Sequence, residues 1–237
     1  MKILTIVGSP RENANTHFLS QKFGEGAAKV GAEVEEIFLQ KYSIAPCRHC
    51  FGCLKEGICK TEDDFAGIRE KLLAADGILL ASPVYCCSVT AQMKCFMDRC
   101  YCLSFPTWET GLEGKPVFLL VCAGYPPDER YKIVIHHKFT VEAMLKLQKD
   151  LKVIDENMTL RNAIDAMKPF DTTVDTLKLM YQFCAFVGLQ PVGFQEVLSL
   201  GHDKKAVQER PDEIEKASQS GAKFAMMAAM IKQKAFI

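Results

Sequence analysis

Three continuous runs of aliphatic and β-branched residues constrain the fold of this chain most strongly. They cover residues 2–8, 76–82 and 116–123, and each is followed by a turn rich in glycine, proline or small polar residues. Runs of this kind are typical of parallel strands that are buried on both faces of a sheet. Because helical segments separate them, the chain should build βαβ units, with helices covering both faces of the sheet.

Two further strands are expected, at residues 33–39 and 190–200. Helices are expected at 16–29, 63–75, 90–101, 139–151 and 174–187, and after Pro211. Five strands predict an α/β fold, a single flavodoxin-like, doubly wound domain over residues 1–237 with the parallel strand order 2-1-3-4-5. A Rossmann dinucleotide fold would place G-x-G-x-x-G after the first strand, where only Gly8 is present.

The composition excludes several classes of protein. Lysine plus arginine equals aspartate plus glutamate, 29 each, which argues against a nucleic-acid partner. The first apolar run is too short for a signal peptide, and no run approaches the roughly 20 residues of a membrane span. Eleven cysteines without a secretion signal indicate reduced thiols or metal ligands. The prediction is a cytoplasmic protein without a membrane segment.

Four of the cysteines form a dense motif in a loop at about residues 45–62. Their spacing is C-x2-C-x2-C-x5-C, and they are Cys47, Cys50, Cys53 and Cys59. The first three match the ligand triad of bacterial ferredoxins, and Gly57 could let the loop turn back to bring the fourth to the same centre. The motif predicts one 4Fe–4S cluster. A four-cysteine zinc site and a loop without metal remain alternatives, and His49 is interpreted as a solvated loop histidine.

Three loops are predicted to leave the carboxyl ends of the strands, where open parallel sheets bind ligands. They are residues 9–16, 83–88 and 123–126. The first has hydroxyls, amides and Arg11 directly before a helix, and a helix N-terminus with an arginine favours a phosphate group. The alternative is a surface turn capped by Thr16.

Three segments resemble the NADPH-dependent FMN reductase family. They are residues 8–16 (GSPRENANT), residues 82–85 (SPVY) with 88–89 (SV), and residues 92–99 (QMKCFMDR). The cysteine loop with the following Asp63-Asp64 is similar to the iron-sulfur flavoprotein branch of that family. The resemblance covers roughly residues 1–125 with the last strand and helix. Asp98-Arg99 is interpreted as a helix-end ion pair without a catalytic role.

The resemblance implies FMN as cofactor and assigns residues to it. The phosphate would be bound by Ser9, Arg11, Asn15 and Thr16. The ring would lie against Pro83, Val84 and Tyr85 and the chain through Cys86 to Ser88. Its other side would be closed by Ala123, Gly124 and Tyr125. Two departures from the family pattern are Ala14, where glycine is common, and the Cys86-Cys87 pair.

These features predict an FMN-dependent oxidoreductase of the iron-sulfur flavoprotein type. It would pass electrons between a 4Fe–4S cluster or NAD(P)H and an acceptor through FMN, with no catalytic acid or base. The partners would be small-molecule or protein electron donors and acceptors, such as ferredoxin. The alternatives are a cluster-free NAD(P)H-dependent quinone, azo-compound or flavin reductase, and a non-enzymatic electron carrier or redox sensor.

An insert at about residues 128–173 and the apolar run 224–231 are the basis for expecting a homodimer or homotetramer. Five other cysteines are interpreted as buried, small apolar side chains: Cys95, Cys100, Cys102, Cys122 and Cys184. Cys86 and Cys87, which the resemblance places near the flavin, are interpreted as inert thiols.

Overall fold

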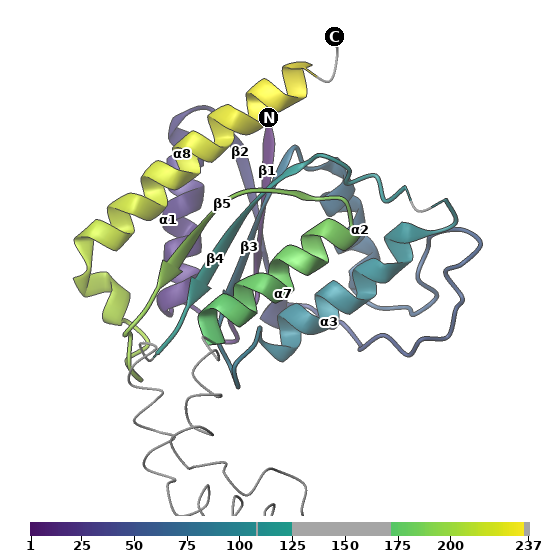
Figure 1. Ribbon diagram of the computed structural model, residues 1–237, viewed down its shortest axis with the longest axis horizontal. Helices are drawn as coiled ribbons and strands as arrows, with labels where there is room; N and C mark the ends of the chain where they lie inside the picture. The colour runs from purple at the N-terminus through teal and green to yellow at the C-terminus, as the bar shows by residue number, and fades with distance from the viewer. Residues whose placement is uncertain (108, 125–171, 235–237) are drawn as a thin grey trace, which may run out of the picture.

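Five parallel strands form one sheet in the computed structural model, which describes residues 1–107, 109–124 and 172–234 (Figure 1). The strand order is β2-β1-β3-β4-β5. The strands are β1 Lys2–Val7, β2 Glu33–Phe38, β3 Gly77–Pro83, β4 Pro116–Cys122 and β5 Gln190–Val197. The predicted flavodoxin-like, doubly wound arrangement is confirmed.

The central strands supply residues to both faces of the sheet, because successive side chains of a strand point to opposite sides. Leu4 and Ile6 of β1 belong to one hydrophobic core, and Ile3 belongs to the other. All residues of β3 and β4 are buried. This double burial is the reason why these strands appear in the sequence as continuous apolar runs.

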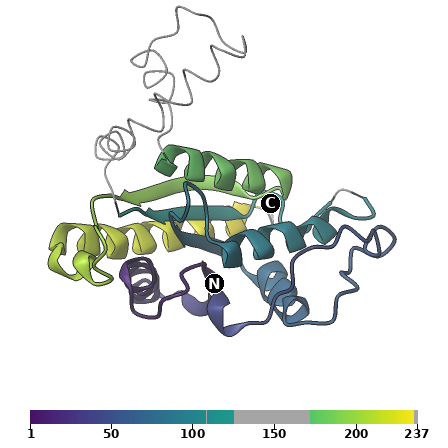
Figure 2. The same ribbon diagram turned by 90° about the horizontal axis from the view of Figure 1, so that it is seen from below.

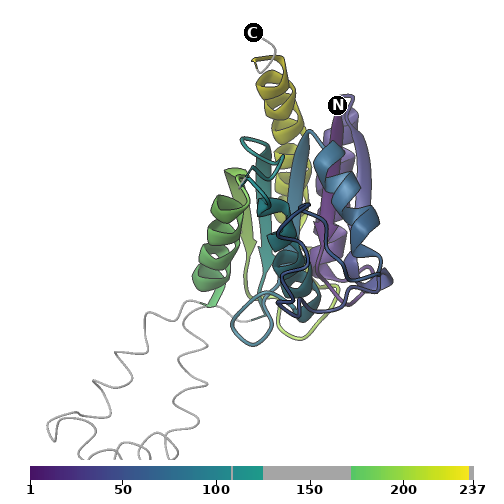
Figure 3. The same ribbon diagram turned by 90° about the vertical axis from the view of Figure 1, so that its right-hand side faces the viewer.

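Five α-helices in the described part of the chain cover the two faces of the sheet. Helices α1 (Asn15–Lys29) and α8 (Pro211–Lys234) pack on one core, and α2 (Phe65–Ala74), α3 (Ala91–Arg99) and α7 (Thr172–Phe186) pack on the other. Figure 2 shows the layers from below, and in Figure 3 helices α2, α3 and α7 stand in front of the sheet with α8 behind it. The strands therefore present only their ends to ligands.

Several predictions fall wholly or partly outside the described residues. The insert at about 128–173, apart from its last two residues, and the helix expected at 139–151 lie there. The apolar run of α8 is described and divides in two: Phe224, Ala225 and Ala228 are buried, whereas Met226 and Met230 are exposed. The homo-oligomer stays a prediction, and the exposed half of this run is the main part of its basis that lies within the described residues. Within the described ranges, no helix combines the length and apolarity that a membrane crossing needs.

Candidate functional site

The loop between β1 and α1 is held by its own hydrogen bonds. The Ser9 hydroxyl accepts from the Arg11 N–H at 3.2 Å and donates to the Arg11 carbonyl at 3.0 Å. Asn13 takes a left-handed conformation with φ 55°, which asparagine tolerates better than most residues. Ala14 has φ −84°, an ordinary value, so the alanine that departs from the family pattern imposes no strain.

Helix α1 begins without a side-chain cap. Its N-cap residue is Ala14, which cannot accept a hydrogen bond through its side chain, and the first turn holds no acidic residue. The first N–H groups of an α-helix have no partner within the helix, and the helix dipole places partial positive charge there. Asn15 and Thr16 are buried at this end, so an anion in front of it would find donors already oriented.

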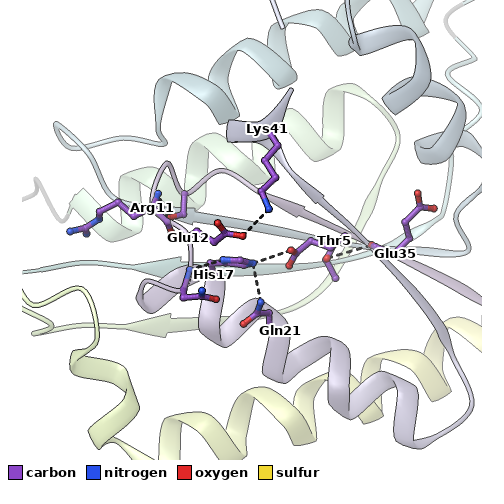
Figure 4. Close-up of polar contacts among 10 residues, drawn as sticks. Thr5, Arg11, Glu12, His17, Gln21, Glu35 and Lys41 are labelled. Atoms are coloured by element: carbon purple, nitrogen blue, oxygen red, sulfur yellow. Dashed lines mark hydrogen bonds and ion pairs between the residues drawn. The ribbon is translucent and has the colours of Figure 1, made fainter. Parts of the chain in front are cut away.

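His17 anchors this loop to the edge of the sheet (Figure 4). Its Nδ1 accepts the Asn13 N–H at 2.9 Å, and its Nε2 lies 2.9 Å from Glu36 Oε1. The Asn13 contact uses Nδ1 as an acceptor, and in that tautomer the Nε2–H group faces the carboxylate. The ring also stacks on Phe38, with centroids 4.6 Å apart. Sequence reasoning missed His17, since its partners become neighbours only in the fold.

Charged side chains at the same loop take two different directions. Glu12 pairs with Lys41 at 2.7 Å. Figure 4 shows the Arg11 side chain extending away from this pair. Arg11 is exposed and is also one of the residues that line a cavity at the carboxyl edge of the sheet.

The loop after β3 makes a tight turn. Tyr85 and Ser88 exchange backbone hydrogen bonds of 2.9 and 3.0 Å, and Cys86 and Cys87 between them have φ values of 46° and 65°. Two left-handed residues in a row characterise a type I′ turn, which normally selects asparagine and glycine. The Val84 N–H donates to the Cys122 carbonyl at 2.8 Å, so this turn is fixed to the end of β4.

A cavity of about 210 Å³ lies where these loops meet the end of β5. Its lining residues come from four loops and strand ends: Ser9, Arg11, Ala14, Asn15, Thr16, Pro83, Val84, Tyr85, Cys122, Ala123, Gly124, Leu200, Gly201 and His202. The loops after β4 and β5 run close together, and the Gly201 N–H donates to the Gly124 carbonyl at 2.7 Å. A Cβ on Gly124 would stand 2.8 Å from the Gly201 carbonyl oxygen, so glycine is required for this approach.

The cysteine loop is tied to the C-terminal end of α3 by Arg99. Its Nη1 lies 2.5 Å from Asp63 Oδ2 and its Nη2 lies 3.0 Å from Asp63 Oδ1, with both side chains almost fully buried. Asp98 instead pairs with Lys94 at 2.6 Å, so the predicted Asp98–Arg99 ion pair is wrong. Adjacent residues on a helix point in different directions, and of the two it is Arg99 whose side chain reaches Asp63.

The loop reaches its position through Gly57. This residue has φ 65°, and a Cβ on it would lie 2.3 Å from the Phe105 carbonyl oxygen. The expectation that Gly57 lets the loop turn back therefore agrees with its conformation. His49 is exposed, and its ring lies 4.2 Å from the ring of Phe51.

The four loop thiols differ in their surroundings. Cys47 and Cys50 are exposed, whereas Cys53 and Cys59 are partly buried. Burial raises the pKa of Cys53, and the neighbouring thiols add to this effect. Burial also acts to raise the pKa of Cys59, but the Thr61 N–H and the Arg99 charge outweigh it, so that pKa is lowered. Cys59 therefore forms the thiolate, the metal-binding state, more readily.

All four thiols line one cavity of about 20 Å³, together with Arg99 and Tyr101. Among the described residues, no three histidine, cysteine or acidic side chains are gathered into a site for a single metal ion.

The cysteine loop lies beside the C-terminal end of α3, while Thr90, which caps the other end of this helix, donates to the Gly8 carbonyl at 2.6 Å (Figure 1). The nine residues of α3 span about 14 Å. The loop leaves β2 on the side of the sheet that holds the 210 Å³ cavity, as expected. Its four cysteines, however, do not line that larger cavity.

A profile of the NADPH-dependent FMN reductase family matches residues 1–130, more than half of the chain. The chain belongs to the NADPH-dependent FMN reductase family. An iron-sulfur flavoprotein of Methanocaldococcus jannaschii is 43% identical over 99 residues, 42% of this chain and 51% of the relative. A putative NAD(P)H-dependent FMN-containing oxidoreductase of Bacillus subtilis is 31% identical over 134 residues, 54% of this chain and 69% of the relative.

The chain spans about half the length of the iron-sulfur flavoproteins it matches. Among solved structures, an NAD(P)H:quinone oxidoreductase from Methanothermobacter marburgensis aligns with a TM-score of 0.61 at 14% identity, over 94% of this chain and 98% of that one. At this identity the likeness shows the fold, which is the one derived above.

Most residues predicted to bind FMN line the 210 Å³ cavity: Ser9, Arg11, Asn15, Thr16, Pro83, Val84, Tyr85, Ala123 and Gly124. Cys86 and Ser88 do not line it, because the turn directs them elsewhere, and Tyr125 lies outside the described residues. The Asn15 amide is already engaged, with Asp203 O at 2.8 Å and Val207 N at 3.0 Å. FMN binding by these residues stays a prediction.

Sequence reasoning missed the loop after β5, which supplies Leu200, Gly201 and His202 to the cavity. A usable signal was present, since Gly201 and His202 directly follow the strand expected at 190–200. Of the cysteines predicted to be inert, four are buried: Cys100, Cys102, Cys122 and Cys184. Burial raises the pKa of Cys122 to about 12 and that of Cys184 to about 12. Cys95 is half-buried, while Cys86 and Cys87 are exposed.

Proposed function

We propose that this protein is an FMN-dependent oxidoreductase of the iron-sulfur flavoprotein type. The observation that carries the proposal is the uncapped N-terminus of α1, which opens on a cavity with Arg11 at its edge. A phosphate group there would accept hydrogen bonds from the first-turn N–H groups and a charge-assisted bond from Arg11. The membership in the FMN reductase family supports FMN as the source of that phosphate.

The rest of the cavity suits the ring of FMN. Pro83, Val84 and Tyr85 would contact one part of the ring, and the paired loops that contain Gly124 and Gly201 would contact another. When bound, FMN accepts or donates electrons singly or as hydride, and the protein positions the ring and excludes water. Ser9 Oγ keeps its two bonds to Arg11 and thereby holds the loop in the binding conformation.

The cysteine loop is proposed to hold one 4Fe–4S cluster on Cys47, Cys50, Cys53 and Cys59. Two features of the structure fit this group: four thiols surround one cavity, and a buried guanidinium beside them can offset the charge of thiolates. The names of the iron-sulfur flavoprotein relatives support the same assignment. A cluster would supply single-electron transfer beside the two-electron chemistry of FMN.

The electron partners are proposed to be NAD(P)H or a one-electron protein donor such as ferredoxin, with a small-molecule or protein acceptor. A cluster-free NAD(P)H-dependent reductase is the second candidate. One observation favours it specifically: the cavity proposed for FMN and the cavity of the cysteine loop share no lining residue. The flavin site can therefore form without the cluster.

Arg11→Ala is expected to weaken FMN binding by about 1.5–3 kcal/mol, the range for a hydrogen bond to a charged group. This corresponds to a dissociation constant about 10- to 150-fold higher. Flavin fluorescence, titrated with protein from which the flavin has been removed, measures it. Lys22→Ala is the matched control, because Lys22 is a cation on α1 that pairs with Glu25 at 2.7 Å and does not line the cavity. An unchanged FMN affinity in Arg11→Ala would contradict the placement of the phosphate.

A further inference from the structure

The Arg99 guanidinium makes contacts on both sides of the four-cysteine motif. Nη1 donates to the Ala45 carbonyl at 2.9 Å, two residues before Cys47. Nη2 approaches the Thr61 carbonyl at 3.4 Å, two residues after Cys59. One rigid, planar group therefore holds together the two ends of the loop, and lysine could not reproduce these contacts with a single ammonium.

The guanidinium is fixed by three further contacts. Asp63 accepts from both Nη atoms, as described above, and the Phe65 ring lies 4.9 Å from Arg99 Cζ. The Arg99 side chain is 1% exposed, and that of Asp63 is 7% exposed. A buried charge needs this degree of pairing, because water cannot solvate it. The position of Arg99 is thus determined before any ligand arrives.

One donor of this group remains unused. Arg99 Nε is buried and has no hydrogen-bond partner among the described residues. A buried N–H without a partner is costly, and an absent ligand, ion or water is one explanation for such a group in a native structure. Arg99 lines the same cavity as all four loop thiols. A sulfur of a bound centre is one acceptor for Nε in that cavity.

We propose that Arg99 closes the cysteine loop and that its Nε–H donates to a sulfur of the bound cluster, which raises the reduction potential of the cluster. This inference rests on the cluster of the proposed function. Reduction adds one negative charge to a centre that four thiolates already make anionic. A fixed positive charge and a hydrogen bond to sulfur both stabilise the reduced state more than the oxidised one.

The test is a potentiometric titration of the anaerobically purified protein, followed by the electron paramagnetic resonance of the reduced cluster. Arg99→Gln removes the charge, and the double variant Asp63→Asn/Arg99→Gln replaces the buried ion pair with a neutral pair if the single variant folds poorly. Arg99→Gln should show at least a tenfold lower ratio of reduced to oxidised cluster at a fixed potential, which is 59 mV for a one-electron couple. The double variant also loses the Asp63 negative charge, so it should show a smaller shift of the same sign, from the lost hydrogen bond to sulfur. The potential of FMN should stay unchanged.

Lys94→Gln is the matched control, since it removes a cation from α3 whose partner is the exposed Asp98. An equal shift of the cluster's reduction potential in Lys94→Gln would mean that any positive charge on α3 has this effect, and it would overturn the specific role of Arg99. A cluster with the wild-type potential in both Arg99 variants would also overturn it. Absence of a cluster from the wild-type protein would instead refute the proposed function on which the inference rests.

Discussion

Asp63→Ala is expected to lower the free energy of unfolding by about 3–5 kcal/mol, the range for removing one partner of a buried ion pair. The substitution would leave the buried Arg99 charge without its carboxylate. It would also remove the acceptor of the Ala45 N–H at 2.9 Å and of the Phe65 N–H at 3.1 Å. Urea unfolding at neutral pH, followed by circular dichroism, measures the change.

Two variants separate this effect from general sensitivity to charge. Asp98→Ala removes an exposed carboxylate from a pair with Lys94 and should cost no more than about 0.5 kcal/mol. The double variant Asp63→Leu/Arg99→Met should recover most of the loss, because it leaves no unpaired charge. A loss below about 1 kcal/mol in Asp63→Ala would show that the pair does not organise the loop.

The ion pair of Asp63 and Arg99 also predicts how the free energy of unfolding depends on pH. Burial acts to raise the pKa of Asp63, but the Arg99 guanidinium and the N–H groups of Ala45 and Phe65 outweigh it, so the folded-state pKa lies below 3.8. The unfolded state therefore binds the proton more readily than the folded state. The stability from this carboxylate is present above pH 3.8 and is lost as the pH falls below that value toward the folded-state pKa. In Asp63→Ala, the free energy of unfolding should fall less in this acid range.

Gly221→Ala is expected to cost about 3 kcal/mol, at the upper end of the range for overpacked cores. Helices α1 and α8 cross with their backbones in contact, and a Cβ on Gly221 would stand 1.9 Å from the Phe23 carbonyl oxygen. On the other helix, a Cβ on Gly26 would stand 1.8 Å from the Ser218 carbonyl oxygen. A backbone carbonyl cannot rotate away as a side chain can, so the helices would have to separate.

The separation of α1 from α8 should also disturb the proposed flavin site, because the uncapped N-terminus of α1 opens on that site. We expect Gly221→Ala to weaken FMN binding as well as to lower the urea midpoint. Gly67→Ala is the control: Gly67 lies in α2, and no atom lies within 4 Å of the position of an added Cβ. It should be neutral or stabilise the protein by up to about 1 kcal/mol, because alanine favours the helix. Equal stabilities of the Gly221→Ala and wild-type proteins would contradict the close crossing.

The sheet could be predicted from the sequence because its central strands are buried on both faces. Such strands need apolar residues at every position, and the runs at 2–8, 76–82 and 116–123 show this directly. The ends of elements were less certain. The fifth strand ends at Val197 rather than Leu200, since the chain turns there with Ser199 at φ 60°.

The contacts that position the sites could not be predicted in the same way. Arg99 and Asp63 are 36 positions apart, and Asn15 and Val207 are 192 apart. No local pattern links such residues, so Asp98 was the nearest plausible partner for Arg99 and the wrong one. The motifs indicated which loops are candidates for the chemistry, while the separation of the cysteine loop from the cavity proposed for FMN follows from the path of α3.

The most direct test of the proposed function is the cofactor content of protein purified without oxygen. The wild-type protein should contain about one FMN, four iron and four sulfide per chain, as a single 4Fe–4S cluster requires. Cys53→Ala should lose iron and sulfide but keep FMN, because Cys53 does not line the flavin cavity. Wild-type protein without bound FMN, even after incubation with it, would contradict the central claim. Protein with FMN, no iron and one zinc per chain would refute the cluster and leave the cluster-free reductase.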